Sequence, residues 1–225
     1  NFAKKGQRHI PHIYTESEIA EIWEIFDHLP YRKNYPIRHL VLPTLIRLLY
    51  CCGLRPCEAR KLQCTNVDLE KGRLNIVESK GHKSRIVMLS DDVTDFCRKY
   101  NAQVSALMPE RNLFFPNSQG ELYTKGWLEK TFRIVRAKAK IETSGEHAPR
   151  LYDFRHTFAT HRLYKWMCEG KDITAMLPYL SAYMGHAQLS DTYYYIHLVP
   201  GLFEKMSGFN YSLSEMLLPE VEYDE

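Results

Sequence analysis

Apolar residues recur at helical spacing in the first part of the chain, and polar residues mark where the helices begin and end. Thr15 and Glu18 have the spacing of a capping box and predict a helix that starts there. A second stretch, roughly 37–52, predicts a buried helix, with Pro43 giving it a kink or a late start. Gly53 is expected to end this second helix. The apolar faces consist of Ile19, Ile22, Trp23 and Phe26 in the first helix, and of Leu45, Leu48, Leu49 and Cys52 in the second.

Three short stretches in the next part of the chain have the composition and alternation of strands. They are Asn66–Leu69, Arg73–Val77 and Arg85–Leu89. Turn residues separate them at 70–72 and at 80–83. Because both connections are short, neighbouring strands must run in opposite directions. We therefore expect a small three-stranded antiparallel sheet.

Helical patterns return after the sheet. They cover roughly 91–107, 125–140, 151–164 and 175–184, and a last helix follows that contains three consecutive tyrosines, Tyr193, Tyr194 and Tyr195. Together with the strands, these helices predict a mainly α fold with a small three-stranded antiparallel sheet. At 225 residues and 44% hydrophobic, the chain is long enough to bury a sizeable core in one main domain.

The helix expected over 125–140 has a basic side. Its apolar side carries Leu128, Phe132, Val135 and Ala139, and its basic residues are Lys130, Arg133, Arg136 and Lys140. A basic face is usually no more than solvated surface, but it is also what a helix in a DNA groove presents. The sequence leaves both interpretations open.

Charge and cysteine usage narrow the class of protein. The net charge is +3, but the stretch from Glu215 onward holds five acidic and no basic residues, which leaves 30 bases against 22 acids on the rest. This distribution favours a surface that binds a polyanion. The six cysteines form no CxxC pair, which is typical of reduced core thiols, and we expect no metal and no cofactor. The chain has neither a secretory apolar region nor a bilayer-spanning run, so a cytoplasmic, nucleoid-associated protein that makes no membrane contact is expected.

Residues suited to phosphodiester transfer without a metal occur in separate stretches of the chain. They are Arg55 with Glu58 one turn on, Lys80 at the tip of the expected hairpin, Tyr152 with Arg155 three residues later, His186, and the tyrosines at 193–195. Guanidinium groups bind phosphate oxygens, a lysine can protonate a departing alkoxide, and a phenol can attack phosphorus. Each residue alone has a commoner structural explanation, such as a surface ion pair, a turn lysine, a helix-terminal histidine or a packed aromatic. The functional interpretation therefore depends on their joint occurrence.

The order and spacing of these residues closely resemble the catalytic domain of tyrosine recombinases, the phage integrase type. Gly53-Leu54-Arg55-x-x-Glu58 is similar to the first arginine box of that family, and the hairpin around Lys80 to its lysine box. The stretch Asp153–His161 is similar to the second arginine box almost residue for residue. Met184-Gly185-His186, followed nine residues later by Tyr195, is similar to the final box and selects Tyr195 over Tyr193 and Tyr194. The resemblance covers roughly 15–200.

The resemblance implies that Tyr195 attacks the scissile phosphate of DNA, giving a 3′-phosphotyrosine and a free 5′-hydroxyl. It implies that Arg55 and Arg155 hold the phosphate, with Glu58 orienting Arg55. It also implies that Lys80 protonates the leaving oxygen. His186 and Tyr152 would assist by hydrogen bonding, and Lys83 with the basic residues of 125–140 would contact DNA.

The chain departs from the family pattern at Tyr152, where the family usually has a histidine. A phenol is a poor base at pH 7, so the identity of the general base is open, with His147 as a more distant alternative. The family also carries an N-terminal core-binding domain, to which residues 1–14 would be the linker, with the catalytic domain at 15–200.

The tail at 201–225 has two interpretations, a terminal helix packed on its own domain or a segment that docks on a neighbouring protomer. The expected partners are double-stranded DNA and three further copies of the chain in a homo-tetramer on paired sites. The expected activity is site-specific recombination for the integration or excision of a mobile element. The alternatives are DNA relaxation of the type IB topoisomerase kind, a catalytically impaired DNA-binding module, and a plain helical interaction domain.

Overall fold

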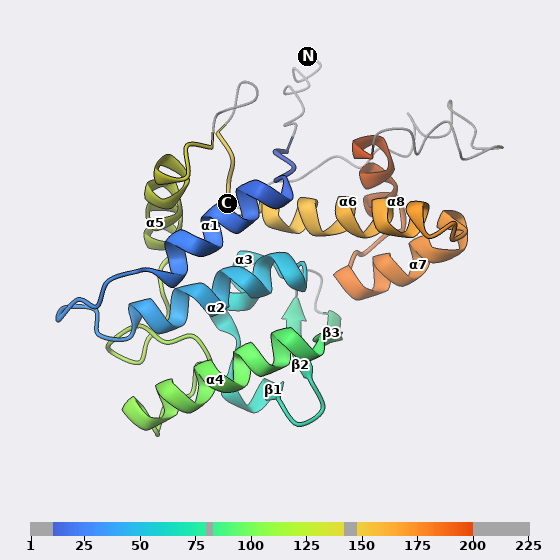
Figure 1. The fold of residues 1–225 in the computed structure, drawn as a ribbon. Helices are drawn as coiled ribbons and strands as arrows, with labels where there is room; N and C mark the ends of the chain where they lie inside the picture. Colours follow the sequence, from blue (N-terminus) through green and yellow to red (C-terminus); the bar gives the residue numbers. More distant parts are fainter. Residues whose placement is uncertain (1–10, 80–82, 142–147, 200–225) are drawn as a thin grey trace, which may run out of the picture.

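The computed structural model describes residues 11–79, 83–141 and 148–199 (Figure 1). In chain order the elements are α1 (Glu16–Asp27), α2 (Arg38–Cys51), α3 (Pro56–Lys61), η1 (Cys64–Asn66), β1 (Val67–Asp68), β2 (Arg73–Ser79), β3 (Lys83–Met88), α4 (Asp91–Leu107), α5 (Lys125–Lys138), α6 (Asp153–Cys168), α7 (Ile173–Met184), α8 (Ser190–Tyr193) and η2 (Tyr194–Leu198). The strands form a three-stranded antiparallel sheet in the order β1-β2-β3. The predicted fold class is confirmed.

Helix α1 begins at the predicted capping box. The Thr15 hydroxyl accepts a hydrogen bond from the Glu18 backbone N–H at 3.2 Å, and the Glu18 carboxylate accepts one from the Thr15 backbone N–H at 2.8 Å. These bonds satisfy two of the backbone donors that a helix start leaves without partners. The apolar face that follows is buried at Ile19, Ile22 and Phe26, as the periodicity predicts.

Thr15→Ala is expected to lower the free energy of unfolding by about 1 kcal/mol, because the cap loses its acceptor while nothing in the core changes. Urea denaturation measures the difference. Thr174→Ala, at an exposed position in α7, is the matched control and should have a smaller effect. Equal losses in the two variants would contradict the capping role.

Helix α2 is the buried centre of the fold and packs against α1, α3, α4 and α6. It begins at Arg38, so Pro43 lies inside it and the late start considered for this helix is wrong. A proline there removes one backbone hydrogen bond, while its ring is buried in the core beside Val41 and Leu42. Gly53 ends the helix with φ +58°, and a Cβ there would lie 2.5 Å from the Phe158 ring. The glycine therefore lets the end of α2 approach α6 closely.

The sheet differs from the prediction at its ends. Strand β1 keeps two of the four expected residues, because the 3-10 helix η1 includes Asn66 and the following turn includes Leu69. Strands β2 and β3 pair in the register Leu74↔Val87, with both side chains buried, and a register shift lies between Ile76 and Ser79. The hairpin thus extends to Ser79 on one side and to Lys83 on the other, beyond the predicted strand ends.

The later helices follow the prediction with shifted ends. Helix α5 ends at Lys138, two residues early, and Lys140 has a left-handed φ of +52°. Helix α7 starts at Ile173 because the Asp172 carboxylate accepts the backbone N–H of Thr174 at 2.9 Å. The expected tyrosine helix is two pieces, α8 and the tighter η2.

Two apolar clusters form the core. The larger joins α1 to α5, the sheet and the start of α6, and the smaller joins the rest of α6 to α7, α8 and η2. Helix α6 therefore belongs to both clusters. It contacts α7 and η2, and α8 contacts α7 (Figure 1). Of the six cysteines, only Cys52 and Cys97 are fully buried. The prediction of core thiols is therefore confirmed for these two residues. None of the helices within 11–79, 83–141 and 148–199 is long and apolar enough to cross a membrane.

Candidate active site

Three segments far apart in the chain meet around one buried arginine. Arg155, in the first turn of α6, donates from Nη1 to the carbonyl oxygen of Gly53 at 2.7 Å and from Nη2 to that of Met184 at 2.6 Å. Arg55, the residue before α3, donates to the carbonyl oxygen of Gly185 at 3.3 Å. The ends of α2 and α7 and the start of α6 are thus tied together, and the sequence-predicted residues Arg55, Arg155 and His186 share one site.

Arg155 is 1% exposed, and burial followed by the nearby Arg55 charge lowers the pKa of its guanidinium. Its Nε is buried and has no hydrogen-bond partner among the described residues. A buried N–H without an acceptor costs free energy, so this donor is suited to an oxygen that a ligand supplies. A phosphate oxygen between the two guanidinium groups fits this arrangement.

Glu58 holds Arg55 as expected, and it also holds a second arginine that the sequence analysis missed. Its carboxylate accepts from Arg55 Nη1 at 2.8 Å and from Arg85 Nη1 and Nη2 at 2.7 and 2.8 Å. Burial is the largest single influence on Glu58 and opposes its charge, but the hydrogen bonds and charge of Arg85, together with the charges of Arg155 and Arg55, lower the pKa of Glu58 to about 2. Burial likewise opposes the charge of Arg55, and Glu58 together with Tyr152 outweighs burial, which raises the pKa of Arg55.

His186 follows the end of α7 and packs flat against the Tyr195 ring, with 5.9 Å between the ring centroids and 14° between the planes. Its Nδ1 shares a hydrogen bond of 2.8 Å with the hydroxyl of Thr192, a fully buried residue that the sequence analysis also missed. Burial, and then the charges of Arg155 and Arg55, lower the pKa of His186 to about 2. The ring is therefore neutral at pH 7, with one nitrogen able to donate a hydrogen bond and the other able to accept one.

Tyr195 is the member of the tyrosine run that faces these residues. It is 3% exposed, whereas Tyr193 and Tyr194 are half-buried. Burial raises the pKa of the Tyr195 phenol, and the Arg155 charge opposes that rise. Neighbouring cations of this kind are what a phenol requires in order to react as phenolate. Of the three tyrosines, Tyr195 is the most buried, and its ring lies against His186.

Tyr152 immediately precedes α6 and contributes to the electrostatics of Arg55, Arg155 and Tyr195, which places it in the same group. One turn on from Tyr152 is His156, which the sequence analysis did not select. The His156 ring centroid lies 5.2 Å from that of Tyr152 and 5.6 Å from that of Tyr195, and the residue is 8% exposed. The spacing of four from Tyr152 was a signal, because it puts both side chains on one helical face.

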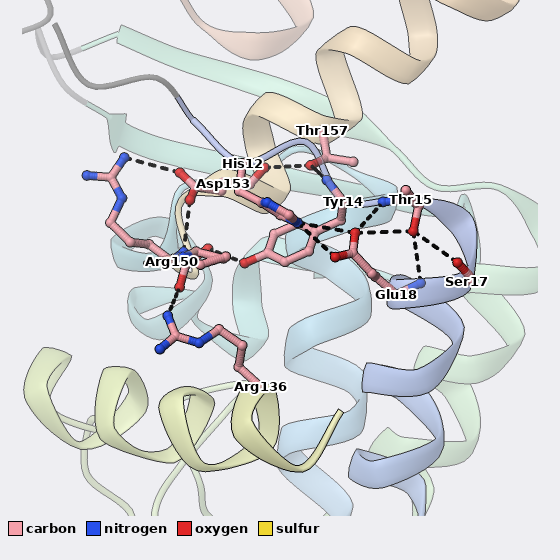
Figure 2. Close-up of polar contacts among 10 residues, drawn as sticks. His12, Tyr14, Thr15, Ser17, Glu18, Arg136, Arg150, Asp153 and Thr157 are labelled. Atoms are coloured by element: carbon pink, nitrogen blue, oxygen red, sulfur yellow. Dashed lines mark hydrogen bonds and ion pairs between the residues drawn. The ribbon is translucent and has the colours of Figure 1, made fainter. Parts of the chain in front are cut away.

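The start of α6 is held in place by the segment that precedes α1 (Figure 2). Tyr14 is fully buried and stacks on Phe154 with 4.7 Å between ring centroids. It donates from its hydroxyl to the Arg150 carbonyl oxygen at 2.9 Å and from its backbone N–H to Thr157 Oγ1 at 3.0 Å. Asp153 accepts from the Arg150 backbone N–H at 2.8 Å. These bonds fix the turn of helix that carries Tyr152 and Arg155.

The expected DNA-contact residues of the stretch 125–140 fall into two groups. Lys130, Arg133 and Lys140 are exposed. Arg136 is half-buried and donates to the carbonyl oxygen of Pro149 at 2.7 Å, which links α5 to the loop before α6 (Figure 2). Lys80 and His147 lie outside the described residues, as does the tail at 201–225, and Lys83 is described only as the first residue of β3.

The chain is similar to known proteins over most of its length. Residues 14–200 match the model of the phage integrase family. The chain is 33% identical over 188 residues to the putative integrase/recombinase y4rE of Sinorhizobium fredii, covering 83% of this chain and 59% of the relative. It is 28% identical over 198 residues to the tyrosine recombinase XerD of Staphylococcus haemolyticus, covering 86% and 60%. The chain thus spans about three fifths of the length of these curated relatives.

Among solved structures, the XerH site-specific recombinase bound to palindromic difH substrate, a post-cleavage complex, has the same fold. The two chains align with a TM-score of 0.68 at 22% identity, covering 90% of this chain and 54% of XerH.

Proposed function

Because this chain belongs to the phage integrase family, we propose that it is the catalytic domain of a site-specific DNA recombinase that cuts and rejoins DNA strands. The observation that carries the proposal is the grouping of Arg55 and Arg155 at the end of α7, next to His186, whose ring lies against Tyr195. The charges of both arginines act on the Tyr195 phenol. The XerH structure supports double-stranded DNA as the substrate, since that protein of the same fold is bound to its DNA site after cleavage.

In the proposed reaction, the Tyr195 oxygen attacks the scissile phosphorus, and the bond from phosphorus to the 5′ oxygen breaks. The product is a 3′-phosphotyrosine with a free 5′-hydroxyl, and attack by another 5′-hydroxyl reverses the step and releases the tyrosine. Arg55 and Arg155 stabilise the charge that develops on the phosphate oxygens, with Glu58 orienting Arg55. His186, neutral and held by Thr192, donates a hydrogen bond to the phosphate from Nε2. Lys80 protonates the departing 5′ oxygen.

The Tyr195 proton requires an acceptor, and we assign it to His156. Tyr152, at the position where the family usually has a histidine, is a phenol and a poor base at pH 7. His186 is unsuited to accept a proton because its neighbours lower its pKa to about 2. The His156 imidazole packs between Tyr152 and Tyr195 and is the remaining described base beside the nucleophile.

His156→Asn is expected to slow cleavage about a hundredfold, which is the usual scale for loss of a general base. The wild-type rate should fall as the pH is lowered and the base is protonated, and the variant should lose that dependence. His161→Asn is the control, since His161 is on the same helix and bonds Tyr50 at 3.0 Å, away from the site. A variant that is slow but keeps the wild-type pH dependence would rule out the proton-accepting role.

The function is tested by covalent trapping on duplex DNA from the flanks of the gene, with a sulfur in place of the 5′ bridging oxygen. The sulfur leaves without needing a proton and does not re-attack readily, so the adduct should accumulate and survive denaturing electrophoresis. Salt-dependent binding without an adduct would instead identify a DNA-binding module. An adduct together with relaxation of supercoiled plasmid, but no exchange between two sites, would identify topoisomerase-like activity.

We further propose that the biological role is the integration or excision of a mobile element, in a homo-tetramer on two paired sites. The name of the Sinorhizobium relative, integrase/recombinase, supports the first part. In this proposal residues 1–14 link the catalytic domain at 15–200 to a DNA-clamping domain, and 201–225 dock on a neighbouring protomer. Recombination between two marked plasmid sites, with the mass of the protein–DNA complex measured in parallel, tests both parts.

A further inference from the structure

We propose that Arg85, on strand β3, is a positioning residue that keeps the charge of Arg55 available to the scissile phosphate. This inference rests on the proposed recombinase function. Arg85 acts through Glu58, the carboxylate that it shares with Arg55, and has no direct role in the chemistry.

The contacts of Arg85 are buried and use three of its donors. Nη1 and Nη2 donate to the two oxygens of Glu58 at 2.7 and 2.8 Å, and Nε donates to the carbonyl oxygen of Tyr183 at 2.9 Å. The side chains of Arg85 and Glu58 are 8% and 5% exposed. A two-pronged guanidinium–carboxylate pair with this little exposure holds a fixed geometry.

The same carboxylate also holds Arg55. Glu58 Oε1 accepts from Arg55 Nη1 at 2.8 Å, and Oε2 accepts from the Arg55 backbone N–H at 2.9 Å. One negative charge thus lies between two positive charges, and the group of three residues keeps a net positive charge in a poorly solvated place. Without Arg85, the full charge of Glu58 would act on Arg55, and the carboxylate would compete with a phosphate for that guanidinium.

The electrostatics of Glu58 support this role. Burial alone would favour the neutral acid. Hydrogen bonding and attraction by Arg85, followed by the charges of Arg155 and Arg55, together outweigh burial. Glu58 therefore stays ionised with its pKa at about 2, and Arg85 is the group that contributes most to this.

Arg85 also connects two parts of the site. It lies on the strand that follows the Lys80 segment, and its side chain passes directly against Gly185, where a Cβ would lie 2.9 Å from Arg85 Cδ. Gly185 has φ +70° and immediately precedes His186. The first arginine and the glycine before His186 are therefore joined through the side chain of Arg85.

The test is single-turnover cleavage of the sulfur-substituted duplex. Arg85→Gln is expected to slow cleavage about a hundredfold, the scale of a displaced catalytic group, with DNA affinity little changed. Arg85→Lys keeps the charge without the two-pronged contact, so its cleavage rate should fall between those of the wild type and Arg85→Gln. This variant can still test the inference if the glutamine variant folds poorly. Arg98→Gln breaks an exposed pair with Asp95 and is the matched control.

Measuring Arg85→Gln in a protein that already carries Arg55→Ala distinguishes a role in positioning Arg55 from a general effect on stability. If Arg85 acts through Arg55, then Arg85→Gln should cost little more than about twofold when Arg55 is already alanine, because coupled residues are not additive. A purely structural role would cost the same factor in both backgrounds. Equal factors, or a wild-type rate for Arg85→Gln, would overturn the inference.

The coupling can also be measured without catalysis. Arg85→Gln should shift the Nε–H resonance of Arg55 in a ¹⁵N NMR spectrum, and Arg98→Gln should not. An unshifted resonance overturns the inference whether or not the protein cleaves DNA. A shifted resonance in a protein that forms no adduct would instead support the positioning of Arg55 while removing the recombinase function.

Discussion

Tyr195→Phe is expected to leave a folded protein that binds DNA and forms no covalent adduct with it. The substitution removes one oxygen atom and keeps the ring that stacks on His186 and packs beside His156. Without that oxygen no bond to phosphorus can form. Loss of a nucleophile in other enzymes lowers turnover by on the order of a millionfold, so the adduct should fall below detection.

The measurement is denaturing electrophoresis of the protein with the sulfur-substituted duplex, alongside a binding assay. Tyr193→Phe and Tyr194→Phe are matched controls, since they remove the same atom from the two neighbouring, half-buried rings. Both controls should form the adduct. If Tyr195→Phe forms it and one of the controls does not, the nucleophile is a different member of the tyrosine run.

The secondary structure could be predicted from the sequence because local chemistry determines most of it. The capping box at Thr15 and the periodic apolar faces of α1 and α2 depend on residues that are close together in the sequence. The misplaced ends have tertiary causes. Helix α2 tolerates Pro43 because surrounding elements bury it, and β1 is shortened where η1 takes one of its residues. These competing contacts have no signature in the local pattern.

The site could be predicted only in part, for a related reason. Arg55, Arg155, His186 and Tyr195 carry recognisable spacing, but their supports come from elsewhere in the chain. Arg85 is 27 residues from Glu58, and only packing brings them together. One signal was present in the sequence. Arg85 lies two residues before the buried Val87, so both face the inward side of β3, while Ile86 and Met88 lie on the exposed side. An arginine on an inward face needs a carboxylate partner.

The buried cations explain why these supports are necessary. Arg55 and Arg155 are 7% and 1% exposed, and a guanidinium in such a place is costly unless carbonyl oxygens and carboxylates surround it. Gly53, Met184 and Gly185 supply carbonyl oxygens and Glu58 supplies the carboxylate. The donors that remain are aimed in fixed directions, which is the preorganisation that stabilises a developing charge.

Arg155→Gln is therefore expected to produce the second largest loss. Its guanidinium donates to Gly53 and Met184, and its buried Nε has no hydrogen-bond partner among the described residues. Removing one such charge-stabilising donor costs about 3–4 kcal/mol of transition-state stabilisation, or roughly a hundredfold to a thousandfold in cleavage rate. The two carbonyl oxygens also lose their partners, so the free energy of unfolding should fall by about 1–3 kcal/mol for each.

The two effects are separated by measuring cleavage well below the unfolding temperature and by comparison with Arg155→Lys. Lysine keeps the positive charge but cannot reach two carbonyl oxygens and a phosphate at once, so cleavage should remain well below wild type. Arg162→Gln, on the same helix with its guanidinium 5.8 Å from the Phe158 ring centroid, is the control and should cleave normally. DNA affinity should change little, because one phosphate contact among many contributes a small part of binding. If Arg155→Gln instead loses DNA affinity while the bound complex cleaves at the wild-type rate, Arg155 serves ground-state binding and does not stabilise the transition state.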